Sequence, residues 1–433
     1  MKKVLIIAYY WPPTGGGGVY RWVKFVKYLR DYGWEPIVYT PSNPEAGIRD
    51  ESLLKDIPSD ITILKRKITE PYSFYKVFTG KKKKSTFDNF VKTNKSTGNS
   101  LKEKISIWIR GNLFIPDARC WWIKPSVRFL RKWLKEHPVD VIVSTGPPHS
   151  MHMIGLKTVR NSGIPWLADF RDPWTNIDFY HLLRLSGWAD RKHRKLERRV
   201  LQTANRVVTV TPSWGELMKE LGAQSVHVVN NGYDSEDFEF LPIEQDKEFS
   251  ITHVGSLNGA RNPIALWNAL SEICNENIEF KSKLKLRFLG AVDYSVKENL
   301  KTLNLIEQTE FCGYVTHDEA LKIGARSAVL LLLLNNTPGV QGIIPGKMYE
   351  YLASNRPILL IGPEACDSAR ILSETQSGYR AGFDDVSGIK QSILALWEDD
   401  KINKSNTDYQ KIQQFSRKNL TEKLAKILDD MVR

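Results

Sequence analysis

The stretch Gly-Ile-Ile-Pro-Gly-Lys-Met-Tyr-Glu-Tyr-Leu-Ala-Ser-Asn-Arg-Pro-Ile-Leu-Leu-Ile-Gly, residues 342–362, holds the most informative pattern of the sequence. A loop marked by glycine and proline leads into a short helix with Lys347 and Glu350, and a buried strand follows. Such a loop offers free backbone N–H groups and a positive dipole end to an anion. Lys347 adds a full charge, and Glu350 can accept hydrogen bonds from hydroxyls. The pattern predicts a site for a phosphorylated sugar.

The other end of the chain contains a second glycine-rich loop. An apolar strand, Val4 to Ala8, precedes Trp11-Pro12-Pro13-Thr14 and four glycines, Gly15 to Gly18. A helix over 19–29 is predicted next, because apolar residues recur on one helical face. Glycines let a backbone approach a ligand closely, since no Cβ stands in the way. A flexible turn is the alternative, but the position directly after the first strand favours a functional loop.

Strands and helices alternate along both halves of the sequence. In the first half we expect further strands at 36–40, 139–144, 166–170, 207–211 and 226–229, and in the second half at 250–255, 284–289, 310–313, 329–334 and 357–361. Near-continuous apolar runs separated by helices are typical of a parallel sheet covered on both faces. The sequence therefore predicts an α/β protein with two Rossmann-like sheets.

Size and charge restrict the classes of protein that fit. A chain of 433 residues exceeds the usual size of one core, so two domains are expected. The net charge of +13 implies attraction to nucleotide-sugar phosphates, a lipid surface or nucleic acid. The longest apolar run, Ala328 to Leu334, is too short to span a bilayer. Four scattered cysteines fit a reducing, cytoplasmic compartment: Cys120, Cys274, Cys312 and Cys366.

Three segments together resemble a GT-B-fold glycosyltransferase, most similar to the large retaining family 4. They are the helix Lys347 to Ala353, the turn Asn231-Gly232-Tyr233-Asp234 and the N-terminal glycine loop. The resemblance covers nearly the whole chain, because strands, loops and helices recur in the expected order. It implies two facing Rossmann-like domains with an interdomain cleft. It also implies a nucleotide-diphosphate sugar donor of the UDP or GDP type, with no cofactor.

On this basis we expect an N-terminal acceptor domain at 1–240 and a C-terminal donor domain at 241–405. The last stretch, 406–433, has helical periodicity and is expected to cross back onto the first domain, as the final helix does in the family. One segment breaks the alternation. Residues 78–100 are polar and include four consecutive lysines, Lys81 to Lys84, so a mobile surface loop is predicted there.

The resemblance assigns the donor site residue by residue. Where the family usually carries an Arg and a Lys that clamp the diphosphate, this chain has Ser256 and Arg261. Arg261 can bind phosphate bidentately, although a solvated loop charge is the alternative. Glu350 matches the acid that resembles the ribose ligand, and Gly342 replaces the first family glutamate. The full set of expected donor-binding residues is Gly16, Gly17, Gly18, Ser256, Arg261, Tyr314, Val315, Ile344, Lys347 and Glu350.

The richest polar cluster of the first domain follows the strand 166–170. Strand alternation turns Asp169 and Arg171 to the same side, and Asp172 comes next. Many family members place a sugar-contacting His where Arg171 stands, and His149 lies where relatives contact the acceptor. Asp169, Arg171, Asp172 and His149 are therefore the candidate catalytic residues. A salt bridge between Asp and Arg that holds the loop, and a helix cap by His149, remain open as alternatives.

The mechanism follows from the resemblance. Retaining transfer through an oxocarbenium-like state needs stabilisation of the leaving diphosphate, which Arg261, Lys347 and the helix N-terminus would supply without a metal ion. No His/Asp/Glu cluster has metal-ligand spacing. The leaving phosphate oxygen could take the acceptor proton, and a double displacement with Asp172 as nucleophile is the weaker alternative. The implied activity is that of a hexosyltransferase in bacterial surface polysaccharide biosynthesis.

Two basic stretches bear on the acceptor. Residues 125–137 and 191–199 are rich in Lys and Arg, and Trp108, Phe114, Trp121 and Trp122 lie just before the first. Basic helices with aromatic flanks can lie on an anionic membrane. We therefore expect peripheral contact with the inner face of the cell membrane and a glycan or polyprenyl-linked acceptor. The alternative is that the apolar faces pack on the sheet and the basic faces are solvated.

Two other classes of protein compete with the transferase. A GT-B-like sugar-nucleotide 2-epimerase would share the architecture and the nucleotide site, but its chemistry needs paired carboxylates and a His around the sugar carbon. A protein that binds nucleic acid or other anions non-enzymatically would explain the charge. The chain lacks aromatic–glycine RNA-binding signatures and a helix-turn-helix pattern, so no nucleic-acid partner is expected.

Overall fold

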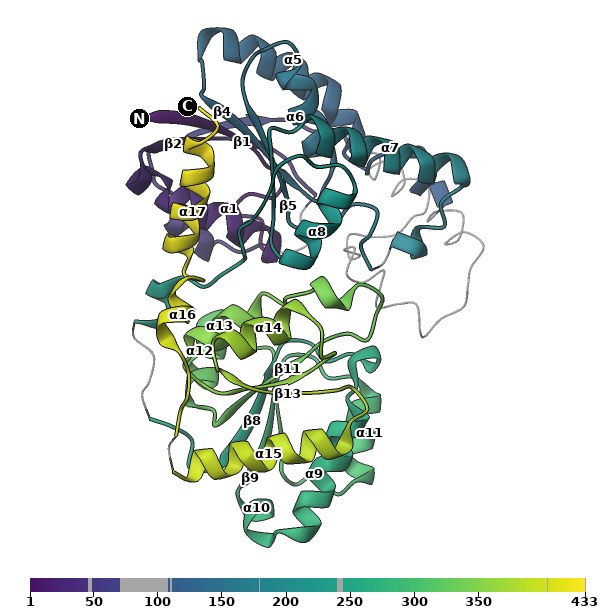
Figure 1. The fold of residues 1–433 in the computed structure, drawn as a ribbon, viewed down its shortest axis with the longest axis vertical. Helices are drawn as coiled ribbons and strands as arrows, with labels where there is room; N and C mark the ends of the chain where they lie inside the picture. Colours follow the sequence, from purple (N-terminus) through teal and green to yellow (C-terminus); the bar gives the residue numbers. More distant parts are fainter. Residues whose placement is uncertain are drawn as a thin grey trace. The chain divides into compact units, whose positions relative to one another are not determined.

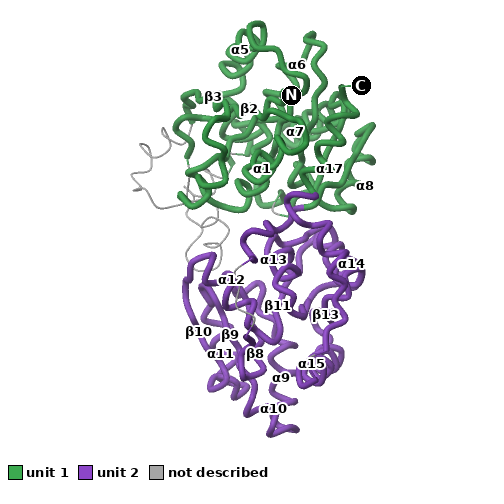
Figure 2. Tube along the Cα trace, turned by 90° about the vertical axis from the view of Figure 1, so that its left-hand side faces the viewer, with its two compact units in different colours: residues 1–230, 420–433 green, residues 231–419 purple. Residues whose placement is uncertain are grey.

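The computed structural model describes residues 1–45, 49–70, 108–109, 111–178, 180–239, 244–402 and 404–432. The chain divides into two compact units, one made of residues 1–230 and 420–433, the other of residues 231–419 (Figure 2). The loop expected at 78–100 and the domain boundary expected at 240 lie outside the described residues.

The first unit is built on a seven-stranded parallel sheet of order β3-β2-β1-β4-β5-β6-β7. Figure 1 labels β1, β2, β4 and β5 of this sheet. Its strands are β1 (Lys2–Ile7), β2 (Trp34–Pro41), β3 (Thr62–Arg66), β4 (Val141–Gly146), β5 (Trp166–Phe170), β6 (Arg206–Thr209) and β7 (Val226–Val228). Its helices are α1 (Gly17–Tyr28), α5 (Cys120–Glu136), α6 (Ser150–Val159), α7 (Gly187–Thr203), α8 (Pro212–Glu220) and most of α17 (Arg417–Asp429).

Both faces of this sheet are buried, as near-continuous apolar strands require. Alternate residues of β1 belong to two different cores. Leu5 and Ile7 pack with residues of α5, α6, α7 and α8, whereas Val4 and Ile6 pack with residues of α1 and α17. The C-terminal helix therefore completes the core of the first unit, although it is the last element of the chain.

The second unit repeats the design with a six-stranded parallel sheet of order β10-β9-β8-β11-β12-β13. Its strands are β8 (Phe249–Val254), β9 (Leu284–Leu289), β10 (Thr309–Gly313), β11 (Val329–Leu333), β12 (Ile358–Ile361) and β13 (Gly378–Ala381). Its helices are α9 (Ile264–Glu276), α10 (Ile278–Lys283), α11 (Tyr294–Thr302), α12 (His317–Arg326), α13 (Lys347–Ala353), α14 (Asp367–Glu374), α15 (Val386–Lys401) and α16 (Tyr409–Gln413). Short 3-10 helices lie at Leu29–Tyr32, Ser52–Asp56, Tyr180–Leu183, Ser235–Phe238, Gly259–Arg261 and Val340–Gly342.

The faces of the second sheet are also covered. Residues of α9, α10, α11 and α15 fill the core on one face, and α13, α14 and α16 contribute to the core on the other. The predicted α/β fold with two parallel sheets is confirmed. Two strands, β3 and β13, were not predicted from the sequence. Both are edge strands, and β13 is only four residues long and starts at a glycine.

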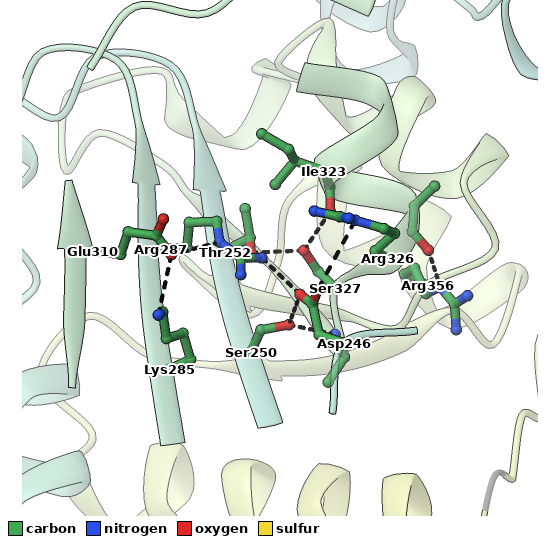
Figure 3. Close-up of polar contacts among 12 residues, drawn as sticks. Asp246, Ser250, Thr252, Lys285, Arg287, Glu310, Ile323, Arg326, Ser327 and Arg356 are labelled. Atoms are coloured by element: carbon green, nitrogen blue, oxygen red, sulfur yellow. Dashed lines mark hydrogen bonds and ion pairs between the residues drawn. The ribbon is translucent and has the colours of Figure 1, made fainter. Parts of the chain in front are cut away.

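The entry of the chain into the second unit is fixed by a polar network around Asp246 (Figure 3). The Asp246 carboxylate accepts hydrogen bonds from Arg287 Nη1 at 2.7 Å and from Ser250 Oγ at 2.8 Å. Its backbone N–H donates to the main-chain oxygen of Arg326 at 2.9 Å. Arg287 also donates to Glu310 at 3.1 Å. The segment before β8 is thereby tied to β9 and to the end of α12.

Within the described part of the chain, no helix has both the length and the apolar character needed to cross a membrane.

Candidate functional site

The candidate donor site of the second unit lies where its sheet order reverses. The chain runs outward from β8 through β9 to β10, and then returns to β11 on the other side of β8. In open parallel sheets, ligands bind beyond the carboxyl ends of the strands at such a switch point. The segments that follow β8 and β11 contain Gly255 to Arg261 and Asn335. The predicted donor segment after β8 therefore lies where this fold binds ligands.

Lys347, the first residue of α13, reaches back to the end of β8. Its Nζ donates to the main-chain oxygen of Val254 at 2.8 Å and lies 3.4 Å from His253 Nε2. Burial and then the charge of Arg261 lower the pKa of Lys347 to about 7, while Glu350 acts in the opposite direction. A bound anion would favour the ammonium form and so raise the pKa of Lys347 again.

Arg261 is the second cation of the site. Its Nε donates to Asn335 Oδ1 at 2.7 Å, and its backbone N–H donates to Asn258 Oδ1 at 3.1 Å. Burial lowers the pKa of Arg261, but a guanidinium stays charged at all ordinary pH values. One of its five N–H groups is used by Asn335, and the described residues accept no other hydrogen bond from the guanidinium. The outer fork remains free to bind phosphate oxygens.

Glu350 lies on the same helix as Lys347 and contacts a residue that sequence reasoning missed. His317, at the start of α12, lies 3.2 Å from Glu350 Oε1 through its Nε2. This contact with Glu350 raises the pKa of His317. The carboxylate is thus held by a cation when His317 is protonated. The charges of Arg261 and Glu350 both shift the pKa of Lys347, so both residues lie near its ammonium group.

The other predicted donor-binding residues of the second unit follow β8 and β10 or precede α13. Gly255 has a φ of 106°, which only glycine adopts readily, and the exposed Ser256 follows it. Tyr314 is 94% exposed, and Val315 beside it is half-buried. Ile344 packs against the core near α13. An exposed aromatic ring such as that of Tyr314 is available for stacking on a ligand.

In the first unit, the glycine loop and the cluster after β5 come together. The Nη1 of Arg171 would lie 2.1 Å from a Cβ at position 18, so Gly18 makes room for the guanidinium. A Cβ at position 16 or 17 would have no heavy atom of another residue within 4 Å. Arg171 donates to the main-chain oxygens of Gly146 and Pro147, and the described residues form no ion pair with it.

Asp169 has a different environment from the two charged residues that follow it. It is fully buried and accepts hydrogen bonds from Arg21 Nη2 at 3.0 Å, Trp22 Nε1 at 2.7 Å and Thr145 Oγ1 at 2.8 Å. These bonds tie β5 to α1 and thereby fix the helix that the glycine loop enters. The salt bridge considered from the sequence is present, but its cation is Arg21 and not Arg171.

The carboxylate of Asp172 has different surroundings from that of Asp169. It is half-buried, and no described residue is hydrogen-bonded or ion-paired to it. Burial raises the pKa of Asp172, and the neighbouring Arg171 opposes this shift. The carboxylate therefore has the proton affinity and the free oxygens that an acid–base or nucleophilic role would need.

His149 is held by ring stacking at the start of α6. Its ring lies parallel to that of Trp174, with centroids 4.6 Å apart, and burial lowers its pKa far below the usual range. Nδ1 of His149 has no partner among the described residues. Two residues of α7 that the sequence did not single out support this arrangement. His193 accepts from Trp174 Nε1 at 3.0 Å, and Glu197 accepts from Thr175 Oγ1 at 2.5 Å.

The basic stretches form parts of α5 and α7, and in each case one face packs on the first unit. The buried residues of α7 are Ala189, His193, Glu197, Val200 and Leu201, while its Lys and Arg residues are exposed. Trp188 is 56% exposed and Trp121 is 49% exposed. The described residues contain no group of three or more His, Cys, Asp or Glu placed to hold a metal ion.

Comparison with known proteins bears on the family and the fold. Residues 90–237 match the model of Glycosyltransferase Family 4. The chain resembles glycosyltransferase family 4 and has the GT-B fold. No curated protein sequence matches the chain. Among solved structures with the GT-B fold, sucrose-phosphate synthase from Thermosynechococcus elongatus superposes with a TM-score of 0.63 at 12% identity, covering 99% of both chains.

Two further structures bear on the alternatives. HepE of Anabaena, in complex with UDP-glucose, gives a TM-score of 0.60 at 12% identity and covers 99% of this chain and 100% of its own. A Listeria monocytogenes structure described as a UDP-N-acetylglucosamine 2-epimerase gives 0.54 at 11% identity and covers 98% of this chain and 95% of its own. At such identities the likeness shows the GT-B fold alone.

Proposed function

We propose that the chain is a glycosyltransferase that moves a hexose from a nucleotide-diphosphate sugar to a glycan acceptor, with retention of anomeric configuration. The observation that carries the proposal is the grouping of Arg261, Lys347 and Glu350 at the switch point of the second unit. Two cations suit a diphosphate, and a carboxylate one turn along the helix suits ribose hydroxyls. The family match and the UDP-glucose complex of HepE support this reading.

In the proposed reaction the second unit stabilises the leaving group. As the bond between the sugar and the diphosphate breaks, negative charge grows on the phosphate oxygen, and Arg261 and Lys347 would hold it. The leaving oxygen would take the acceptor proton, so no dedicated base and no metal ion are required. Double displacement through Asp172 is the weaker route. We place this chemistry in bacterial surface polysaccharide biosynthesis, on the cytoplasmic side.

A panel of UDP- and GDP-sugars tests the proposal by thermal shift. We expect one nucleotide class to raise the melting temperature of the wild-type protein. Arg261→Ala, Lys347→Ala and Glu350→Ala should abolish the shift while each apo protein stays folded. Stabilisation that survives all three substitutions would contradict this assignment. Lys426→Ala, at a side chain that is 70% exposed on α17, serves as the control and should respond like the wild type.

The epimerase alternative is separated by product analysis. A transferase should release nucleotide only when an acceptor is added, whereas an epimerase changes the sugar nucleotide without an acceptor. We favour the transferase because residues 90–237 match the model of a glycosyltransferase family. Duplex DNA, titrated while tryptophan fluorescence is recorded, should leave the fluorescence unchanged. A change would show that the net charge of +13 attracts nucleic acid.

We further propose that the acceptor is lipid-linked and that α7 meets an anionic membrane. Lys192, Lys195 and Arg198 are exposed on this helix, and Lys192 lies over the exposed ring of Trp188 at 4.5 Å. Cations beside an exposed tryptophan suit a headgroup layer. Liposomes with anionic lipid should co-sediment the protein at low salt, and charge reversal at these three cations should abolish the binding. Absence of binding at any salt would remove the lipid acceptor without affecting the transferase assignment.

A further inference from the structure

A buried histidine lies directly behind the Lys347 ammonium. His253, near the end of β8, is fully buried, and its Nδ1 lies 3.1 Å from the main-chain oxygen of Leu331 on the neighbouring strand β11. A carbonyl oxygen can only accept, so Nδ1 carries the hydrogen. In the neutral ring Nε2 is then an acceptor. The 3.4 Å contact between Lys347 Nζ and His253 Nε2 therefore has a defined direction, with Lys347 as the donor.

The geometry leaves one ammonium hydrogen unused. An ammonium group has three N–H donors. One goes to His253 Nε2 and one to the main-chain oxygen of Val254, and the described residues accept no third. A Cβ at position 255 would lie 3.9 Å from Nζ, so Gly255 keeps a side chain away from this side of the ammonium. Lys347 is thus fixed from two directions and has one hydrogen left for a ligand.

We propose that His253 is a positioning residue of the donor site, which holds the Lys347 ammonium by accepting its hydrogen bond and so presents the remaining N–H to a phosphate oxygen. The inference rests on the proposed function, because it takes the anion to be a nucleotide diphosphate. An apolar residue at this core position would fill the same space. It would, however, leave Lys347 with one acceptor fewer in a half-buried site.

The charged groups around Lys347 determine what the loss of His253 would do. Arg261 disfavours the ammonium and Glu350 favours it. His253 carries no charge, since burial and Lys347 keep its pKa well below the usual range. A neutral acceptor that bonds to the ammonium stabilises the protonated form. Removal of this acceptor should lower the pKa of Lys347 further, so that less of the lysine is charged at neutral pH.

Two amide substitutions separate the two hydrogen bonds of His253. In His253→Asn the short amide can still donate to Leu331 but cannot reach Lys347. In His253→Gln the longer amide places an oxygen where Nε2 was, and it can accept from Lys347. The first readout needs no ligand. Lysine labelled with ¹³C at Cε is titrated by NMR, and the Lys347 signal is identified by its loss in Lys347→Met.

We expect the Lys347 pKa to fall by about one pH unit or more in His253→Asn and to stay near the wild-type value in His253→Gln. Melting curves confirm that both variants are folded. If Lys347 titrates in both variants as in the wild type, His253 does not hold the ammonium and the inference is overturned. If His253→Asn does not fold, His253→Gln still tests the inference. A Lys347 pKa that falls in His253→Gln would show that an acceptor at the position of Nε2 is not what holds Lys347.

The second readout is the affinity for UDP-glucose, measured by calorimetry at about pH 6 and about pH 8. We expect roughly tenfold weaker binding to His253→Asn at the higher pH, a smaller difference at the lower pH, and near wild-type binding to His253→Gln. Equal affinities at both pH values would overturn the link to phosphate. Failure of the wild type to bind any nucleotide sugar would count against the proposed function, and the titration of Lys347 would still decide the role of His253.

Discussion

Lys347 is half-buried next to Arg261, and these two factors lower the pKa of its ammonium to about 7. In the unfolded chain the pKa of a lysine is about 10.4. Below about pH 7 the lysine is charged in both states, so the folded state bears the full penalty. The penalty shrinks as the pH rises and vanishes above the unfolded pKa. The ammonium of Lys347 therefore costs stability at neutral pH.

Lys347→Met should for this reason raise the melting temperature, with a larger gain at about pH 7 than at about pH 10. Scanning calorimetry at the two pH values measures the difference. Lys426→Met, at the side chain on α17 that is 70% exposed, should change the melting temperature little at either pH. A gain for Lys347→Met that is the same at both pH values would show that packing of the methionine, and not the charge of the lysine, is responsible.

The sequence predicted candidate site residues, but it did not predict the residues that they contact. Arg261, Lys347 and Glu350 could be predicted because each follows a glycine-marked loop next to a predicted strand. His253 could not, because it lies inside the buried strand β8, where a lone histidine looks like a core residue. Its role depends on β11 lying beside β8, which is a property of the sheet order. Asp169 was assigned to chemistry, whereas the fold surrounds it with Arg21, Trp22 and Thr145.

The network that holds the segment before β8 contains one buried ion pair. Asp246 and Arg287 are 2.7 Å apart, and their side chains are 11% and 9% exposed. Asp246→Ala leaves the Arg287 guanidinium without its closest carboxylate, and we expect a loss of roughly 2 kcal/mol, reduced because Glu310 remains as a partner. Hydrogen exchange in peptides from β8 and β9 should rise accordingly.

Two comparisons make this prediction specific. Glu310→Ala removes the partner that is 43% exposed, and we expect it to cost about 1 kcal/mol or less. The double variant Asp246→Ala/Arg287→Met removes both charges and should cost less than the sum of its single substitutions. Faster exchange that is equal for Asp246→Ala and Glu310→Ala would mean that the buried pair does not anchor the segment.

Most strands that sequence reasoning found are buried on both faces, although it also found the half-exposed edge strands β7 and β10. Strands such as β1, β4 and β11 are apolar at nearly every position, and this pattern is hard to mistake. The edge strands β3 and β13 were missed because half-exposed residues give a weaker pattern. Their existence follows from pairing with β2 and β12, which supplies hydrogen bonds that the sequence does not show.

For the whole molecule, the path of the chain is less simple than two consecutive domains. After β13 and α15 the chain continues through α16, and from Leu420 on it belongs to the first unit (Figure 2). Leu420, Leu424 and Leu428 are buried in the core that β1 shares with α1. Trp34 Nε1 donates to Asp429 at 3.0 Å, and Lys2 pairs with the same carboxylate. The first unit cannot complete this core from residues 1–230 alone.

This path predicts which unit responds to a change at the C-terminus. Leu424 is 1% exposed, and Leu424→Ala should destabilise by about 2–5 kcal/mol, because a cavity replaces a packed side chain. The loss should appear in the first unit. Hydrogen exchange should quicken in peptides from α1 and β1, while peptides from β8 and β11 should keep the wild-type rates. This contrast is expected although Leu424 lies only a few residues after the last residue of the second unit, Asn419.

Lys426→Ala is the matched control on the same helix. Its side chain is 70% exposed and pairs with Glu422 at 2.6 Å, so we expect a change of about 0.5 kcal/mol or less and normal exchange in both units. If Leu424→Ala instead quickened exchange in β8 and β11 and left α1 unchanged, the C-terminal helix would serve the second unit in solution. A truncation at residue 405 would therefore remove part of the core of the first unit rather than a dispensable tail.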